Sequence, residues 1–332
     1  MTAKSWGKIL FFASAALLLL FLPLLIESDY VMHLLIMSGI YIISTQSLNF
    51  IAGYMGAISI GHAAFCGIGA YTSALLALHF GLPFWVTSAC GTGLAGLVGL
   101  FLAIPTLKLK SSYLVITTIA FGKIVHLLFV NTIWLTRGPL GLLGIPAPFE
   151  LNIGPLRVDF GSKAHYYYFV LGAVCLVMVL FHRLVNSRTG RAVMAIREDD
   201  IAAEVIGVDV MYHKIMVFVI GTGAAGFAGT LYAHYIHFIS PETFSIYESI
   251  TLLIMVIVGG SGSFFGPVLG AVSITFLLEQ LRFLSDYRLM IYGVILFFVI
   301  FFMPRGLIGL FDLAEARLVP ALSGLFSKRA RP

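Results

Sequence analysis

Long apolar runs separated by short polar or glycine-rich segments dominate the chain. An α-helix needs about 20 apolar residues to cross a hydrocarbon core of about 30 Å, and most of the runs have about that length. The pattern therefore predicts an all-α integral membrane protein with about ten transmembrane helices. We place them at residues 9–26, 31–50, 57–79, 84–106, 112–131, 166–183, 212–235, 248–260, 266–281 and 288–303. The eighth and ninth are short and flank the segment GGSGSFFGP, so they are either half-helices or a re-entrant pair.

The composition supports a membrane location. Hydrophobic residues make up 60% of the chain and charged residues only 11%, too few charges for the surface of a soluble domain. The first run, 9–26, is longer than the apolar core of a secretory signal, and no small-residue cleavage site follows it. We therefore expect a retained first helix, with a cleaved or peripheral segment as the alternative.

Arg and Lys residues indicate the orientation of the helices. Lysines precede the first predicted helix and follow the fourth, and an Arg-rich loop follows the sixth. An even number of crossings separates these places, so they lie on one side, which the positive-inside rule makes cytoplasmic. The tail with KRAR at 328–331 falls on the same side, so both termini are expected in the cytoplasm. The opposing loop, 132–165, is rich in turn residues and is expected to form an ordered cap.

Two segments of the chain resemble each other. GTGLAGLVGLFLA at 91–103 and GTGAAGFAGTLYA at 221–233 are identical at seven of thirteen positions. In the predicted topology they run in opposite directions, as the halves of an inverted repeat do in alternating-access transporters. The alternative is that glycine motifs recur by chance, because glycine lets membrane helices approach closely.

Polar and glycine-rich positions within two predicted spans are candidates for a translocation path. An ionisable side chain or an irregular backbone at membrane depth usually faces protein or a water-filled cavity. We assign to this path Ser59, Gly61, His62, Gly67, Gly259, Gly260, Ser261 and Gly262. The alternative for His62 is one hydrogen bond between helices. Lys123 and Glu279 are expected to extend their side chains to an interface.

The chain shows no catalytic or cofactor motif. GxxxxGK[ST] and HExxH are absent, and the three cysteines lack the spacing of a zinc site. We therefore expect no enzymatic activity and no cofactor bound by this chain. The net charge of +5 is attributed to topology and to contact with anionic membrane lipid, and no nucleic-acid binding is expected.

Charge is concentrated in one internal segment, residues 183–214, which contains ten of the 35 acidic and basic residues. Within it, Asp199 or Asp200 can cap a helix, IAAEVI favours helix, and Gly207 suits the position after its end. The helix would carry three apolar residues on one side, Ile201, Val205 and Val208. The segment is thus either a short amphipathic surface helix that meets a partner or a solvated loop whose arginines only enforce topology.

Several motifs occur in order along the chain: GAISIGHAAFCGIGAYTSALL, GRAVMAIREDDIAAEVIGVDVMYHK, GFAGTLYAHY, VGGSGSFFGPVLGA and MPRGLIGLF. Together they resemble the LivM-type permease family of branched-chain amino acid ABC transporters, from about residue 31 to 311. Ala202, Ala203 and Gly207 match the EAAxxxG signature of such permeases, whereas Ile201 replaces its leading Glu. The resemblance implies an N-terminal transmembrane helix (1–30), a permease core (31–311) and a basic cytoplasmic tail (312–332).

The resemblance also implies a role for the charged segment, which in that family is the coupling helix that sits in a groove of an ATPase subunit. The coupling residues it implies are Arg197, Glu198, Asp199, Asp200, Ala202, Ala203, Glu204 and Gly207. The implied partners are two ABC ATPase subunits, a second LivH-type permease and a periplasmic substrate-binding protein, at the bacterial inner membrane. ATP and Mg²⁺ would be used by the ATPase subunits alone.

Three other functions remain open from the residues. The same fold could carry urea, a short amide or another small solute, because substrate-contacting residues are not readable from the sequence. An ion-coupled secondary transporter should contain a membrane-embedded carboxylate pair, whereas this chain offers only Glu279 near a span end. An integral-membrane enzyme would need a catalytic constellation, which we do not find.

Overall fold

The computed structural model describes residues 28–107, 111–148, 150–153, 156–159 and 162–280, with short pieces at 21–23 and between 287 and 309. The predicted first helix, apart from 21–23, most of the predicted last helix and the basic tail lie outside the described residues.

Six helices in the described part of the chain are long and apolar enough to cross a membrane. They are α2 (Asp29–Asn49), which a π-helical turn (Phe50–Tyr54) extends, α3 (His62–Phe80), α4 (Phe84–Thr106), α5 (Ser111–Asn131), α7 (Lys163–Val185) and α10 (Val210–Ile236). Two shorter apolar helices follow, α11 (Ile246–Gly259) and α12 (Gly266–Gln280).

Short elements connect the long helices. They are α6 (Ile133–Thr136), the 3-10 turns Gly138–Leu140 and Pro241–Phe244, the strands β1 (Leu142–Leu143), β2 (Glu150–Ile153), β3 (Leu156–Asp159) and β4 (Phe238–Ile239), and the helices α8 (Arg188–Glu198) and α9 (Asp200–Val205). β1 pairs antiparallel with β4, and β2 pairs antiparallel with β3.

Each of these eight apolar helices coincides with a predicted run, so the predicted membrane-spanning, helical class is confirmed. The count of ten crossings stays a prediction, because the described residues contain six full-length spans and two short helices. The third helix begins at His62, five residues later than predicted. Gly56 has a φ of +78°, a left-handed conformation that ends the preceding helical turn, and the chain re-enters a helix only at His62.

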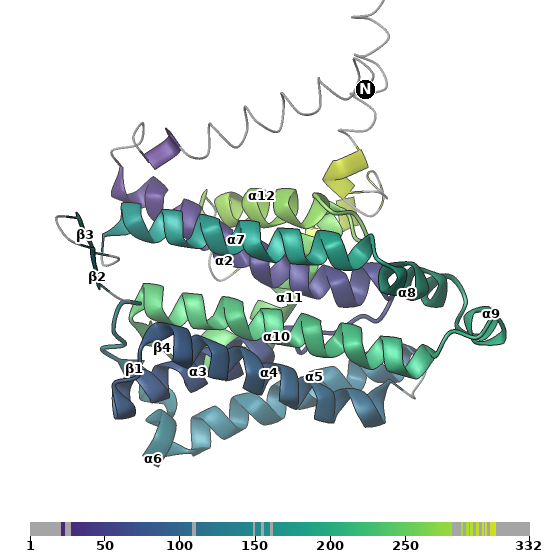
Figure 1. Ribbon diagram of the computed structural model, residues 1–332, viewed down its shortest axis with the longest axis horizontal. Coiled ribbons are helices and arrows are strands. Elements are labelled where there is room, and N and C mark those ends of the chain that lie inside the picture. The colour runs from purple at the N-terminus through teal and green to yellow at the C-terminus, as the bar shows by residue number, and fades with distance from the viewer. Residues whose placement is uncertain are drawn as a thin grey trace, which may run out of the picture.

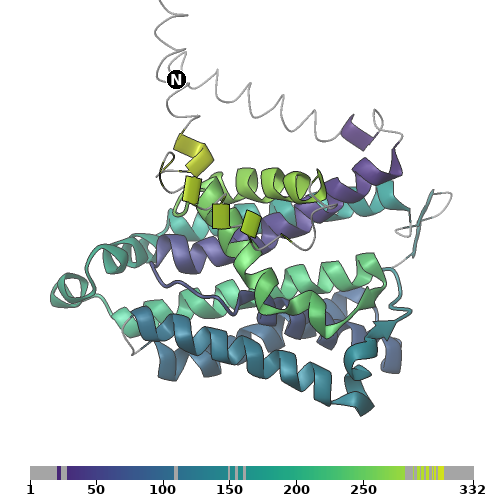
Figure 2. The same cartoon turned by 180° about the vertical axis from the view of Figure 1, so that it is seen from behind.

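The helices form two layers with a short helix between them (Figure 1). α2, α7 and α12 lie side by side in one layer, and α3, α4, α5 and α10 form the other. α11 lies between the layers and contacts α2, α3 and α12. α10 is central, because it packs on α2, α3 and α4, whereas α5 runs along the outer edge of the bundle (Figures 1 and 2).

Glycines allow α3, α4 and α10 to approach closely. A Cβ added at Gly69 of α3 would collide with the carbonyl oxygen of Gly226 in α10, and one at Gly99 of α4 would collide with Thr222. Gly91, earlier in α4, faces Thr230, which is later in α10 than the Thr222 that faces Gly99. The two similar segments therefore lie against each other in opposite directions. This confirms the predicted opposite directions, and the inverted repeat itself stays a prediction.

The connections lie at the two ends of the bundle. The strands and α6 lie at one end, and α8 and α9 project from the other (Figure 1). Two histidines at the end of α10 hold the segment that follows β1. His237 Nδ1 lies 2.7 Å from the carbonyl oxygen of Ile145, and His234 Nδ1 lies 2.7 Å from that of Pro146. The part of the predicted cap around Ile145 and Pro146 is therefore attached to α10.

Candidate functional site

The charged segment folds as two consecutive helices, α8 and α9. Ser187 Oγ caps α8 by accepting a hydrogen bond from the Gly190 backbone N–H (3.2 Å). Asp199 Oδ1 caps α9 by accepting from the backbone N–H groups of Ile201 (2.9 Å) and Ala202 (3.0 Å). Gly207, with a φ of +88°, follows the end of α9. The short capped helix is thus confirmed, with Asp199 as its cap, whereas α8 was not predicted.

α9 exposes an apolar tip. Ile201 is 75% exposed, Val205 82% and Ile206 74%. Removing apolar side chains from water lowers the free energy. Three such side chains on a projecting helix therefore form a surface suited to a protein partner. Val208, predicted on this side, is half-buried instead, because the helix ends at Val205 and the helical spacing assumed for Val208 does not continue. Ile206 is exposed in its place.

The predicted coupling residues divide into two groups. Arg197, Glu198, Asp199, Asp200, Ala202, Glu204 and Gly207 are exposed, and all of them except Arg197 surround the apolar tip. Ala203 is only 2% exposed and faces inward, where its carbonyl oxygen accepts from the Val208 N–H at 3.0 Å. Asp200 forms an ion pair with Lys214 in the first turns of α10, which attaches the tip to a membrane-spanning helix.

Arg197 extends from α8 toward the membrane-spanning helices. A Cβ added at Gly262 would lie 2.5 Å from Arg197 Nη1, and one at Gly56 would lie 3.3 Å from Arg197 Cγ. Gly56 and Gly262 both have left-handed backbone, with φ of +78° and +76°. Arg197 therefore contacts the two places where helical structure is interrupted, after α2 and between α11 and α12.

The loop between α11 and α12 is held by two buried amides of α2. Asn49 Nδ2 donates to the carbonyl oxygen of Ser263 (2.9 Å), and Asn49 Oδ1 accepts from the Gly262 N–H (2.8 Å). Gln46 Nε2 donates to the carbonyl oxygen of Phe264 (2.6 Å). These bonds satisfy backbone groups that the helix break leaves without helical partners. Gln46 and Asn49 stood out in the sequence only as polar residues within an apolar run.

The first group of predicted path residues makes packing contacts. His62 is fully buried, and its Nε2 lies 2.7 Å from Ser47 Oγ of α2, which is the interhelical hydrogen bond that the sequence left as an alternative. A Cβ added at Gly61 would collide with the Thr118 carbonyl oxygen, and one at Gly67 would lie 3.0 Å from Phe129 and Phe244. Ser59 is fully buried as well. A role of these residues in translocation stays a prediction.

The second group forms the loop that Arg197 and Asn49 contact. Gly259 lies against the carbonyl oxygen of Gly266, Gly260 has a φ of +117°, and Ser261 is exposed. Gly262 joins this group to the first helix break, because a Cβ on it would also lie 3.1 Å from the Gly53 carbonyl oxygen. The structure therefore brings Gly262 next to Gly53 in the π-helical turn that follows α2.

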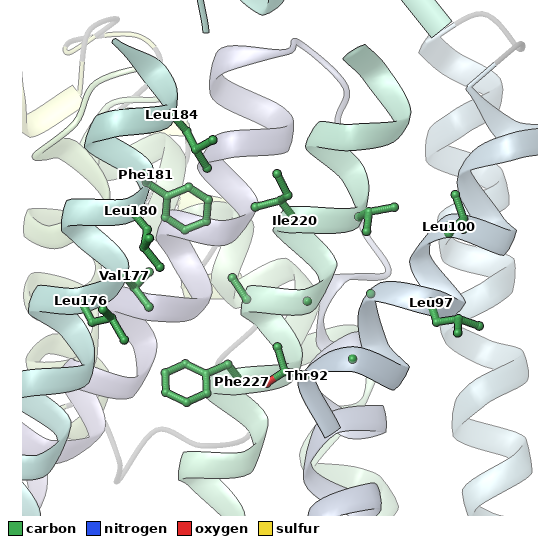
Figure 3. Close-up of a pocket in the computed structure, with 15 residues that line it drawn as sticks. Thr92, Leu97, Leu100, Leu176, Val177, Leu180, Phe181, Leu184, Ile220 and Phe227 are labelled. Carbon is green, nitrogen blue, oxygen red and sulfur yellow. The ribbon is translucent and has the colours of Figure 1, made fainter. Parts of the chain in front are cut away.

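An apolar cavity of about 740 Å³ lies between α4, α7 and α10 (Figure 3). Its lining includes Leu97, Leu180, Phe181, Ile220 and Phe227, and Thr92 supplies its only polar side chain. Such a lining suits an apolar chain better than the charged groups of a free amino acid, because those groups would lose their hydration without gaining partners. In the part of the chain that the structure describes, no three His, Cys, Asp or Glu residues gather as a metal site.

Comparison with known proteins agrees with this architecture. The family described as "Branched-chain amino acid transport system / permease component" matches residues 30–300. The permease protein LivM of the high-affinity branched-chain amino acid transport system is 35% identical in Escherichia coli (strain K12), over 81% of this chain and 68% of that protein. The Salmonella typhimurium LivM is also 35% identical, over 82% of this chain and 68% of its own length.

A probable LivM of Methanocaldococcus jannaschii is 27% identical over 84% of this chain and 93% of that protein. No solved structure matches the chain. The family match covers all six full-length spans as well as α8, α9 and the loop between α11 and α12. This multi-pass membrane chain therefore belongs to the family of permease components of branched-chain amino acid transport systems.

Proposed function

We propose that this chain is the transmembrane permease subunit of an ATP-driven importer for branched-chain or related hydrophobic amino acids. The family membership supports the substrate class, since the LivM relatives are named for branched-chain amino acid transport. The observation that carries the coupling mechanism is the exposed apolar tip of α9, which projects from the bundle on a charged segment. A soluble partner would bury this tip.

The partners follow from the same reasoning. Two ATPase subunits would bind ATP and Mg²⁺ and would contact α9, a second LivH-type permease would complete the membrane domain, and a periplasmic protein would deliver the amino acid. The chain would lie in the bacterial inner membrane, with α8, α9 and both termini on the cytoplasmic side.

Movement would pass from α9 to the membrane helices along two contacts. Asp200 joins α9 to Lys214 of α10, and Arg197 joins α8 to the helix breaks at Gly56 and Gly262. Because interrupted helices lack continuous backbone hydrogen bonds, they bend more easily than the rest of a span. ATP-driven closure of the partner would therefore move the two loops and change access to the substrate route.

The test is a charge placed at the tip of α9. Val205→Asp and Ile201→Asp should lower co-purification of the ATPase subunits and uptake of radiolabelled leucine roughly tenfold or more, as for a buried contact at the centre of an interface. Leu143→Asp is the matched control for co-purification of the ATPase subunits, because Leu143 is 63% exposed at the opposite end of the bundle. Bulky residues at Ala203 are less informative, since its burial means they would disturb α9 itself.

The proposal predicts normal amounts of the Val205→Asp variant in the membrane. Full binding of the ATPase subunits after deletion of residues 198–208 would contradict it. The solute itself is tested by direct binding of leucine, isoleucine, valine and urea to the periplasmic delivery protein.

A further inference from the structure

Lys123 lies near the middle of a membrane-spanning helix. The apolar part of α5 covers Tyr113–Asn131, and Lys123 is ten residues after its start and eight before its end. At about 1.5 Å per residue, the backbone of Lys123 lies roughly 15 Å and 12 Å from the two ends. Its side chain is exposed on the surface of the bundle.

Reaching an interface with the lipid headgroups is difficult for this side chain. The Cα–Cβ bond of a helical residue tilts toward the helix N-terminus, so Lys123 leans toward Tyr113, the more distant end. A lysine at this depth that faced hydrocarbon would be strongly disfavoured, and such residues nearly always face protein or water. The position of Lys123 on α5 therefore argues against the expectation from the sequence that its side chain reaches the headgroup interface.

The face of α5 that carries Lys123 differs from the helix-packing faces of this protein. Its exposed residues recur every three or four positions, as Tyr113, Ile116, Ala120, Lys123, Leu127 and Asn131, and Ile124 and Leu128 are exposed on the adjoining side of the helix. Close helix contacts elsewhere in the bundle use glycine, such as Gly69 against Gly226. The glycine of α5 next to Lys123, Gly122, points inward, where an added Cβ would lie 3.4 Å from Gly61 Cα. The exposed face therefore lacks the glycines that mediate the close helix contacts of this bundle.

No carboxylate within the described residues pairs with Lys123. Two other lysines of the described residues do form ion pairs, both near the ends of spans: Lys163 pairs with Asp29, and Lys214 pairs with Asp200. A cation on an outer face at mid-membrane depth thus requires an anion or water from outside this part of the chain.

We propose that the Lys123 face of α5 borders the water-filled substrate route and that the Lys123 ammonium binds the carboxylate of the passing amino acid. This inference rests on the proposed function and names a binding site for it. A mobile ammonium with three donors suits a transient contact, since it can hold a carboxylate and release it without a fixed geometry. The aliphatic neighbours Ile116 and Leu127 would face an apolar substrate side chain.

The first experiment measures leucine uptake by the assembled transporter. Lys123→Met should raise the KM for delivered leucine or lower uptake by roughly tenfold or more, as expected when a hydrogen bond to a charged group is lost. Lys123→Arg should retain most uptake. Leu128→Met, at an exposed apolar position of the same helix, is the matched control and should behave as wild type. ATPase binding should be unchanged in all three, which separates this result from a failure at α9.

The second experiment measures water access at the same position. In a variant with Cys66, Cys90 and Cys175 replaced, Lys123→Cys should react with a membrane-impermeant methanethiosulfonate reagent, and excess leucine during turnover should slow the reaction. Leu128→Cys should react much more slowly. Wild-type uptake by Lys123→Met, or no labelling of Lys123→Cys, would overturn the proposal. Loss of the second permease from purified Lys123→Met complexes would overturn it as well, since Lys123 would then pair with a carboxylate of that subunit.

Discussion

Arg197 illustrates how one residue joins the surface helices to the membrane domain. It precedes the cap of α9 by two positions, yet its guanidinium lies against Gly262 and its Cγ against Gly56. The aliphatic stem of Arg197 therefore packs beside one helix break and its planar guanidinium beside the other. The resemblance implies an ATPase contact for Arg197, and the geometry shows that this exposed side chain also contacts the membrane domain of this chain.

Replacing Arg197 should therefore uncouple transport from ATPase binding. Arg197→Ala should lower leucine uptake several-fold, because it removes the side chain that lies against both Gly56 and Gly262, while the ATPase subunits still co-purify. Arg191→Ala is the control, because Arg191 is an exposed arginine of the same helix that reaches only the carbonyl oxygen of Asn186 (3.5 Å). The measurements are uptake in proteoliposomes and the ratio of subunits after purification. Equal loss of ATPase binding and uptake would show that Arg197 acts at the docking surface.

At the scale of elements, the contact of α3, α4 and α10 depends on glycines that a larger residue cannot replace. A Cβ added at Gly229 of α10 would collide with the carbonyl oxygen of Cys66 in α3, whereas one at Gly93 of α4 would meet nothing within 4 Å. A backbone carbonyl cannot move aside as the end of a flexible side chain can, so α10 would have to shift relative to α3.

The two glycines provide a matched pair of variants. Gly229→Ala should destabilise the protein by about 1–3 kcal/mol, the usual cost of overpacking a core, and should lower the thermal midpoint measured in detergent. Gly93→Ala should leave the midpoint unchanged or raise it, because alanine is favoured over glycine in helices by up to about 1 kcal/mol. The same midpoint for both variants would show that the contact between α3 and α10 is looser than described.

At the scale of the whole molecule, the two ends of the bundle differ in construction. One end carries short strands tied to α10 by His234 and His237, and the other carries the projecting helices α8 and α9. The proposed function places the strands outside the cell membrane and α9 in the cytoplasm. Under this proposal, the solute would be delivered at the strand end and the ATPase would dock at the α9 end.

Labelling of single cysteines tests this orientation. With the native cysteines replaced, Leu143→Cys should react with an impermeant maleimide in intact spheroplasts, and Ile206→Cys should react only after the membrane is opened. Both side chains are well exposed, at 63% and 74%, so access to the reagent depends on the side of the membrane. The reverse pattern would place α9 outside and exclude the proposed contact with an ATPase.

Much of the fold and part of the candidate site could be predicted from local sequence. Hydrophobic length predicted eight of the described helices to within a few residues, except at the start of α3, where Gly56 interrupts the chain. A cap at Asp199 or Asp200 and an end at Gly207 were also predicted, since capping depends on residues only a few positions apart. The structure shows that Asp199 is the cap. α8 was missed because it is amphipathic, charged and adjacent to a loop.

The sequence by itself thus determined the class of protein, the family and the position of the charged helix, because each follows from hydrophobicity, capping or motif order along the chain. Only the tertiary structure decided that His62 bonds to Ser47, that Asn49 holds the loop at Gly262, and that Arg197 reaches both helix breaks. It also decided that Lys123 lies on an outer face. Contacts between residues far apart in the chain depend on how glycine-containing faces pack, which no local pattern specifies.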